Sequence, residues 1–97
     1  MTALYLTPDA EADIEEGASW YRSRRLGLDD LFLNAVDDCV ASILQFPRGY
    51  QRIRGNIRQA PIKHWPYVVT YSERKDAVTV LRVFMAKQDP RKKFRKR

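Results

Sequence analysis

After a short apolar segment over residues 1–6, the hydrophobic pattern of this chain has a helical period that changes at Pro47 and Gly49, and this change limits the folds open to the chain. Before these residues, apolar side chains recur every three or four positions, as on one face of an amphipathic helix. After them, short runs rich in β-branched and aromatic residues are separated by turn residues, which is typical of strands. A chain of 97 residues in this order has room for one domain, in which helices pack against a sheet.

Two helices are predicted in the first half. Thr7-Pro8-Asp9 provides a side-chain cap, a proline suited to the first helical position and an acid near the positive helix end. The first helix should therefore begin at Pro8 and end near Arg25, and the second should open at Asp29 or Asp30. The two then form a hairpin. The apolar residues at helical spacing are Ala10, Ile14, Ala18 and Tyr21 in the first helix, and Leu28, Phe32, Ala35, Cys39, Ile43 and Phe46 in the second.

The second half of the chain predicts three or four antiparallel strands. Residues 51–54 and 57–64 are joined by Gly55-Asn56, a turn pair that favours a hairpin, and Pro61 indicates that the second of these strands is bulged or near an edge. Residues 66–72 form a further strand, and the apolar run 78–85 predicts a strand buried on both faces near the middle of the sheet. The predicted fold class is α+β: an N-terminal strand, a helical hairpin, then a three- to four-stranded antiparallel sheet with the helices on one face.

Charge is divided unevenly along the chain. Residues 1–46 carry nine acidic and three basic side chains, whereas residues 47–97 carry fifteen basic and three acidic ones. The second half is therefore expected to offer a surface to a polyanion or an acidic partner. We expect one domain over residues 1–90 and a basic tail over residues 91–97, which either binds the target or only aids solubility.

Several classes of protein are not indicated. The chain lacks an apolar run of the roughly 20 residues that a membrane span needs, and its first residues do not resemble an export signal, so a cytoplasmic protein without a membrane partner is expected. Cys39 and His64 are the only residues of their types, which predicts no disulfide, metal site or cofactor. Cys39 is expected to be a buried structural thiol, and His64 a structural or surface residue.

A series of short motifs, each at a junction between expected elements, carries a resemblance to the RelE/ParE superfamily of toxins from type II toxin–antitoxin systems. The resemblance covers nearly the whole chain and rests on the order and spacing of the motifs together. These motifs are Thr7-Pro8-Asp9-Ala10, Trp20-Tyr21, Phe46-Pro47-Arg48-Gly49, Ile57-Arg58, Trp65-Pro66-Tyr67-Val68-Val69-Thr70-Tyr71, Val80-Leu81-Arg82-Val83 and Asp89-Pro90.

The resemblance implies a toxin that is neutralised by a cognate antitoxin, and it leaves two targets open. RelE-like members resemble ribosome-dependent endoribonucleases that cut messenger RNA, whereas ParE-like members poison DNA gyrase and have no generally assigned hydrolytic site. Many members carry a histidine, two residues and an arginine before Asp-Pro, where this chain has Met85 and Gln88. These departures favour a gyrase inhibitor that acts by binding. The alternatives are a ribosome-dependent endoribonuclease and a nontoxic basic nucleic-acid-binding module.

The candidate site residues follow from the resemblance and from the charge pattern. Arg82 interrupts an apolar strand, so it either pairs with a helix carboxylate such as Asp37 or Asp38 or lies as an exposed cation on the open sheet face. If the chain is a nuclease, the candidates are Arg58, Arg82, Lys87 and His64. For target or nucleic-acid binding they are Arg58, Lys63, Arg82, Lys87, Arg91, Lys92, Lys93, Phe94 and Arg95.

Overall fold

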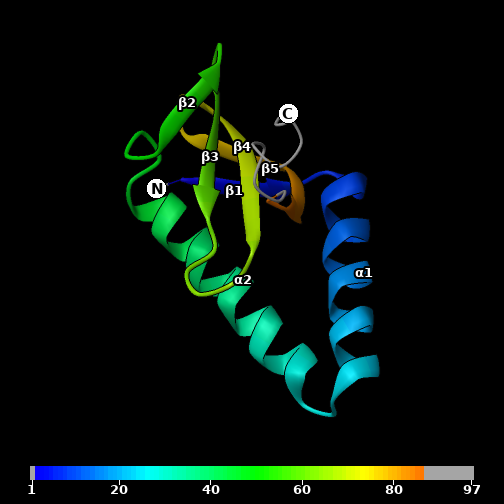
Figure 1. The fold of residues 1–97 in the computed structure, drawn as a ribbon. Helices are drawn as coiled ribbons and strands as arrows, with labels where there is room; N and C mark the ends of the chain where they lie inside the picture. The colour runs from blue at the N-terminus through cyan, green and yellow to red at the C-terminus, as the bar shows by residue number, and fades with distance from the viewer. Residues whose placement is uncertain (1, 87–97) are drawn as a thin grey trace, which may run out of the picture.

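The computed structural model describes residues 2–86, and their elements follow the predicted order of one strand, two helices and a run of strands (Figure 1). Four strands come after the helical hairpin, at the upper end of the predicted range. The elements are β1 (Ala3–Leu6), α1 (Pro8–Arg24), α2 (Leu28–Gln45), β2 (Gln51–Arg54), β3 (Ile57–Pro61), β4 (Tyr67–Arg74) and β5 (Ala77–Met85).

All five strands join in one sheet of order β1-β5-β4-β3-β2. The prediction of three to four antiparallel strands was wrong for the sheet as a whole, which has five strands and is mixed. Strands β2 to β5 pair antiparallel, but β1 pairs parallel with β5, with Ala3 opposite Ala77 and Leu6 opposite Val80. The crossover through the helical hairpin brings the last strand back beside the first, and a parallel pair needs a connection of this length.

The start of α1 is tied to the sheet by Thr7. The backbone N–H of Ala10 donates a hydrogen bond to Thr7 Oγ1 over 3.0 Å, which is the predicted side-chain cap. The same hydroxyl donates to the carbonyl of Leu81 in β5 over 2.8 Å. Thr7 therefore caps the helix and also fixes the position of its first turn relative to β5.

The turn between the helices depends on a glycine and an ion pair. Gly27 has a φ of 93°, a left-handed conformation that favours glycine, and it precedes the first turn of α2. Arg22 Nε donates to Asp29 Oδ2 over 2.8 Å, and this hydrogen bond lowers the pKa of Asp29. The short turn and the ion pair hold together the ends of α1 and α2 that meet there, and the two helices diverge from this point (Figure 1).

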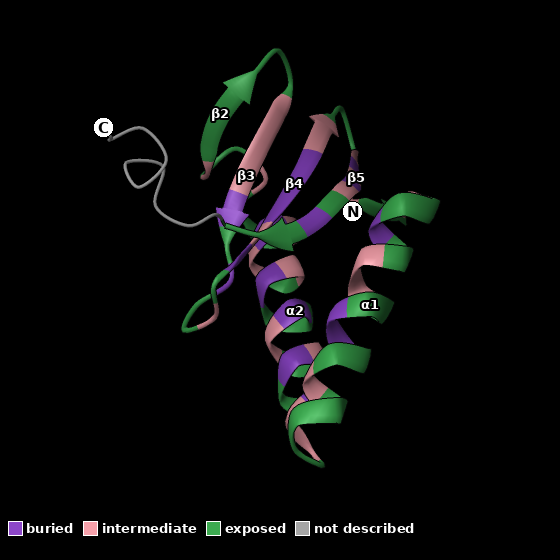
Figure 2. Cartoon of the chain, turned by 45° about the vertical axis from the view of Figure 1, so that its right-hand side comes forward, coloured by how far each residue is buried: buried purple, intermediate pink, exposed green. Residues whose placement is uncertain are grey.

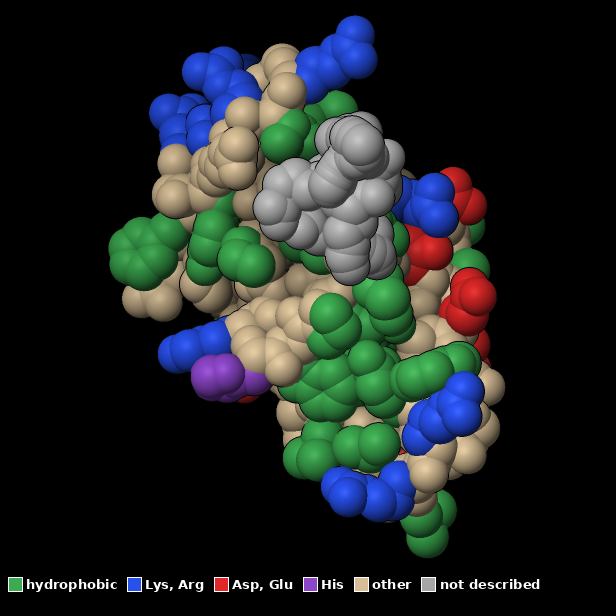
Figure 3. Space-filling view, viewed as in Figure 1, with side chains coloured by type: hydrophobic (Ala, Val, Ile, Leu, Met, Phe, Trp, Pro, Cys, Tyr) green, Lys and Arg blue, Asp and Glu red, His purple; other side chains and the backbone are tan. Residues whose placement is uncertain are grey.

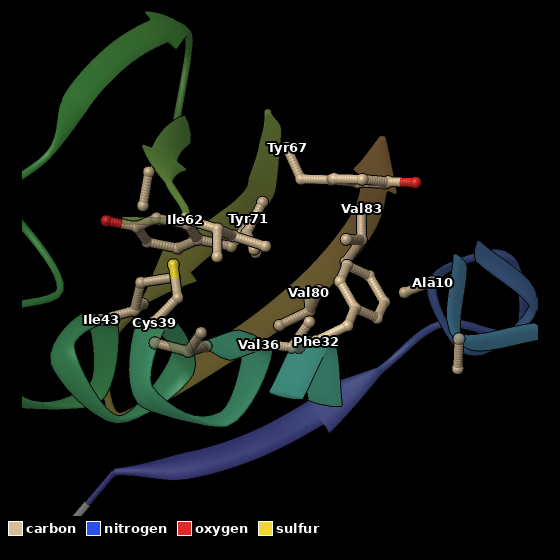
Figure 4. Packing of buried hydrophobic residues seen from close by; sticks show 14 residues of the cluster. Ala10, Phe32, Val36, Cys39, Ile43, Ile62, Tyr67, Tyr71, Val80 and Val83 are labelled. Carbon is tan, nitrogen blue, oxygen red and sulfur yellow. The ribbon is translucent and has the colours of Figure 1, made fainter. Parts of the chain in front are cut away.

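The core lies between the helices and one face of the sheet, as the burial colours in Figure 2 and the close-up in Figure 4 show. Phe32 of α2 is fully buried, and its ring packs 5.0 Å from that of Tyr67 and 5.5 Å from that of Trp65, centroid to centroid. Cys39 is buried as predicted. The other members of the core are Ala10, Ala18, Val36, Ile43, Ala60, Ile62, Val69, Tyr71, Val78, Val80 and Val83.

Two predictions about the strands were wrong in detail. The strand predicted over residues 57–64 ends at Pro61. Its expected place near an edge is confirmed, since it lies next to the edge strand β2, and the irregularity in pairing lies in β2, between Arg52 and Arg54. The last strand is not buried on both faces. The helices cover one face only and β1 pairs with only its first half, so Phe84 and Met85 are exposed.

Neither helix of the described residues is long and apolar enough to cross a membrane.

Candidate target-binding site

Arg82 is held by a carboxylate of α1. Its Nε donates to Asp13 Oδ2 over 2.7 Å and its Nη2 donates to Asp13 Oδ1 over 3.0 Å, while the backbone N–H of Val83 donates to the same Oδ2 over 2.9 Å. The hydrogen bond from Arg82 lowers the pKa of Asp13, and this effect outweighs the opposing effect of burial. A carboxylate partner was one of the two predicted alternatives, but Asp37 and Asp38 were the wrong candidates because α1, not α2, lies along this part of β5.

Replacing Asp13 by asparagine tests this pair. Asparagine keeps an oxygen for the Val83 N–H but loses the charge that faces Arg82, so the urea midpoint of unfolding should fall at neutral pH. The pKa of Asp13 lies below its ordinary value of 3.8, so its ionised form stabilises the fold above that pH and the contribution is lost as the pH falls through the folded pKa. The urea midpoints of the Asp13→Asn variant and the wild type should therefore converge as the pH is lowered below 3.8.

An exposed carboxylate on α2, Asp37, provides the matched control for this measurement. Asp37→Asn should leave the midpoint close to the wild-type value. If the urea midpoint of the Asp13→Asn variant differed from that of the wild type by the same amount across the acidic range, a role for the ionised carboxylate would be contradicted.

Arg58 lies on the other face of the sheet from Arg82. In β3 it stands directly opposite Tyr71, which is buried under the helices, whereas Arg82 stands opposite Thr70, the preceding residue of β4. Residues directly opposite in an antiparallel pair share a face, and successive residues of a strand alternate faces. Arg58 Nη1 donates to the carbonyl of Tyr50 over 2.8 Å, so this guanidinium supports the chain between α2 and β2.

Lys63 and His64 belong to the loop between β3 and β4. Both are exposed and border an open hollow of about 380 Å³ between this loop and α2, and His64 has a left-handed φ of 69°. Cys39 also borders the hollow. Burial raises the pKa of its thiol to about 11, and its Sγ lies 3.7 Å from the carbonyl oxygen of Pro61, so it is an unreactive structural thiol.

Further basic side chains gather at the end of the sheet away from the helical hairpin, around β2 and the β4–β5 turn (Figure 3). Sequence analysis did not select them. The sequence did carry one indication of them, because an arginine stands on each side of Ile53, just before the Gly55-Asn56 turn. These residues are Arg48, Arg52, Arg54, Arg74 and Lys75, and all five are exposed.

A shallow groove lies between α1 and the second half of β5, lined mainly by apolar side chains and, along α1, by Asp13 and Glu16. Trp20, Phe84 and Met85 border it, and each has between 42% and 47% of its surface exposed. Gly17 and Tyr67 line its floor, and its volume is about 260 Å³. Exposed large apolar side chains around one groove are typical of a protein–protein contact.

A comparison with protein-family models decides the class of this protein. The model described as the ParE toxin of the type II toxin–antitoxin system parDE matches residues 4–90. The chain belongs to this toxin family. Family membership implies a cognate antitoxin as partner.

Solved structures agree with the ParE-family assignment in fold. A chain of the chromosomal ParDE toxin–antitoxin system from P. aeruginosa superposes with a TM-score of 0.67 and 24% identity, covering 90% of this toxin and 98% of that chain. The isolated E. coli RelE toxin superposes with a TM-score of 0.60 and 16% identity, covering 92% and 88%. The comparison with curated proteins gave no significant match.

The structure distributes the predicted site residues of this ParE-family toxin over separate places. Arg58 lies on the helix-covered face, Arg82 on the other face against α1, and Lys63 and His64 on the loop beside α2. Among residues 2–86, no group of three or more histidine, cysteine or acidic side chains is arranged to hold a metal ion. The remaining candidates lie outside the described residues: Lys87, Arg91, Lys92, Lys93, Phe94 and Arg95.

Proposed function

We propose that this ParE-family toxin inhibits DNA gyrase in the cytoplasm by binding to it, and that its cognate antitoxin neutralises it. The observation that carries the proposal is the separation of Arg58 and Arg82 onto opposite faces of the sheet, with Arg82 held by both oxygens of Asp13. Two cations placed in this way do not meet at one phosphate.

The chemistry of RNA cleavage explains why this separation matters. Attack by a 2′-hydroxyl needs one group that accepts a proton, another that returns one, and cations that stabilise the phosphate between them. In the described chain, the imidazole of His64 stands on the loop after β3, whereas Arg58 and Arg82 are strand residues already engaged by Tyr50 and Asp13. This arrangement favours binding over hydrolysis.

The basic tail is proposed to share in target binding. Six of the seven residues over 91–97 are lysine or arginine. Such a segment adds electrostatic attraction to an acidic surface or to a complex that contains nucleic acid.

Supercoiling of relaxed plasmid by purified gyrase is the direct test. The toxin should inhibit supercoiling, and toxin mixed beforehand with its antitoxin should not. Replacing the six basic residues of 91–97 by glutamine in the full chain should raise the inhibitory concentration by about tenfold, because electrostatic contacts are lost. The control removes charge from the helical hairpin, with Arg24→Gln and Arg25→Gln together, and should change the inhibitory concentration little.

A parallel assay on ribosomes programmed with messenger RNA separates the two family activities. Intact messages alongside inhibited supercoiling would support the proposal. Cleaved messages with normal supercoiling would replace it by the endoribonuclease function, and the absence of both effects would leave a nontoxic nucleic-acid-binding module.

A further inference from the structure

The first strand of the chain, β1, forms one edge of the sheet and has a neighbouring strand on one side only. It pairs with β5 in a regular parallel register, and the order of the sheet leaves its other side free. Three of its four residues are exposed, among them Leu4 with 39% and Tyr5 with 58% of its surface accessible. Large apolar side chains on a free sheet edge are available to a further strand.

The backbone of β1 offers hydrogen bonds on this free side. The N–H groups of Ala3 and Thr7 donate to carbonyls on the β5 side, over 2.8 and 3.0 Å. Alternate residues of a strand direct their N–H and C=O groups to opposite sides, so those of Leu4 and Leu6 are directed away from β5. The turns, loops and caps of residues 2–86 supply neither leucine with a backbone hydrogen bond. A further strand can therefore pair with β1 without disturbing the sheet.

The two edges of the sheet differ in how they are protected against such pairing. At the other edge, β2 carries Arg52 and Arg54, and its pairing is irregular between them. Charged side chains and bulges both discourage the addition of a strand. β1 has neither, because its sequence Ala-Leu-Tyr-Leu contains no charge and its register is regular. An apolar edge without these devices is expected to be covered by a partner.

A second copy of β1 fits this edge. In an antiparallel pair related by a two-fold axis, the same strand supplies both sides of the contact. With Leu4 opposite the Leu4 of a second copy, Ala3 stands opposite Tyr5, so that a small side chain faces a large one. Leu4 lies on the helix-covered face because it is level with the buried Val78, and Tyr5, level with Thr79, lies on the other face. Both faces of the pair are thus filled by apolar contacts.

Charges at the two ends of β1 favour the same antiparallel arrangement. The β4–β5 turn, with Arg74 and Lys75, lies at the start of β1, since the carbonyl of Asp76 accepts a hydrogen bond from the first residue of the strand. Asp76 offsets one of these two charges. At the end of β1, the first turn of α1 carries Asp9 and Glu11, which are exposed. A two-fold axis brings the basic turn of each copy near the acidic helix start of the other.

We propose that two copies of this toxin associate through β1, antiparallel about a two-fold axis, and form one continuous sheet. A strongly charged partner strand would find no opposite charge on β1, whereas a second copy supplies a neutral strand with complementary charges at its ends. One short strand on each side makes a small contact, so the Kd should be on the order of 10 μM. Such a dimer presents every target-binding surface twice and would bind a target with two sites more tightly than a monomer does.

Sedimentation equilibrium of the full chain, over about 1 to 100 μM, tests this proposal. The average mass should rise from 11.4 kDa toward twice that value. Tyr5→Lys places a charge on each strand at the contact and should raise the Kd by about tenfold or more. Leu4→Pro removes an N–H on the free side and keeps those that face β5, so it should weaken the dimer similarly. The matched control, Ile53→Lys, makes the same kind of change at the β2 edge, on a residue that is 45% exposed, and should leave the Kd unchanged.

Charge reversal tests the orientation of the two copies. Lys75→Glu should raise the Kd by roughly threefold to tenfold, because like charges then lie near each other. Adding Asp9→Lys and Glu11→Lys to this variant should restore the affinity, whereas a failure to restore it would contradict the antiparallel pairing. A thermal melt of each variant at low concentration establishes that the monomer is folded.

Three results would overturn the proposal. A mass that stays at the monomer value up to about 1 mM would exclude the dimer. Equal weakening by Tyr5→Lys and Ile53→Lys would mean that added charge matters and the β1 edge does not. A monomeric toxin whose Tyr5→Lys variant binds the antitoxin more weakly would assign this edge to the antitoxin. Self-association does not depend on gyrase inhibition, so inhibition of supercoiling by a strictly monomeric toxin would leave the gyrase proposal intact.

Discussion

Replacing Phe32 by alanine is expected to lower the free energy of unfolding by about 3–5 kcal/mol, the range found when a buried phenylalanine is truncated. Phe32 is fully buried, and its ring contacts those of Tyr21, Trp65 and Tyr67, with centroids between 5.0 and 5.5 Å away. Truncation would leave a cavity at the point where α1, α2 and the β3–β4 loop meet. Since small domains have only about 5–15 kcal/mol of stability in total, this loss is a large share of it, and the variant should unfold at a much lower urea concentration than the wild type.

Urea unfolding followed by circular dichroism measures this loss. Leu26→Ala is the matched control, because Leu26 is 87% exposed in the turn between the helices and its truncation should cost less than about 0.5 kcal/mol. A loss below about 1 kcal/mol for Phe32→Ala would mean that the aromatic cluster is not packed as described. The variant should also lose every activity of the toxin together, which distinguishes it from substitutions at a binding surface.

Gly17 shows how closely this ring is packed. A Cβ atom added at Gly17 would come within 2.8 Å of Cε2 and Cζ of Phe32. The glycine stands in the interior of α1, where it lowers helix stability by roughly 1 kcal/mol relative to alanine. The close approach of α1 to Phe32 supplies the physical reason for a glycine at this position.

Features that depend on local sequence were predictable. Thr7-Pro8-Asp9 predicted the first residue of α1, because a cap and an N1 proline act within one turn. The helical spacing of Phe32, Cys39 and Ile43 predicted the buried face of α2. The same holds for the turn at Gly55-Asn56 between β2 and β3.

Features that depend on how distant segments meet were not predictable. The apolar run of β5 indicated burial on both faces, but burial also requires a covering layer, and its second half has helices on one face only. The partner of Arg82 was sought in α2, whereas Asp13 is 69 residues away in sequence and reaches Arg82 because Thr7 ties α1 to β5. No periodicity in a single chain encodes such a pairing.

The candidate site was predicted less well than the fold for a related reason. Resemblance to the toxin superfamily drew attention to Arg58 and Arg82, yet the structure uses both within the fold. Arg52 and Arg54 carried a local signal, a basic residue at every second position of an edge strand, but exposure of that strand became evident only from the sheet order.

Introducing a charge into the groove between α1 and β5 is expected to release the toxin from its antitoxin. Phe84 and Met85 are 42% and 47% exposed and border the groove together with Trp20. We expect an amphipathic segment of the antitoxin to cover these side chains, because burial of exposed apolar surface is the main source of affinity at such a contact. Phe84→Asp would place an unpaired carboxylate in that interface, and the Kd for the antitoxin should rise by about 100-fold, or about 2.7 kcal/mol.

Calorimetric titration of antitoxin into the toxin measures this effect, with Leu26→Asp as the control, since it introduces the same charge on an exposed apolar residue of the helical hairpin. Supercoiling assays add a second readout, because a toxin that escapes its antitoxin but retains its target surface should inhibit gyrase in the presence of antitoxin. Unchanged affinity in Phe84→Asp, with weakened affinity in Leu26→Asp, would move the antitoxin contact to the helical hairpin. Loss of affinity in Phe84→Asp together with undiminished gyrase inhibition would separate the antitoxin surface at β5 from the surface that binds the target.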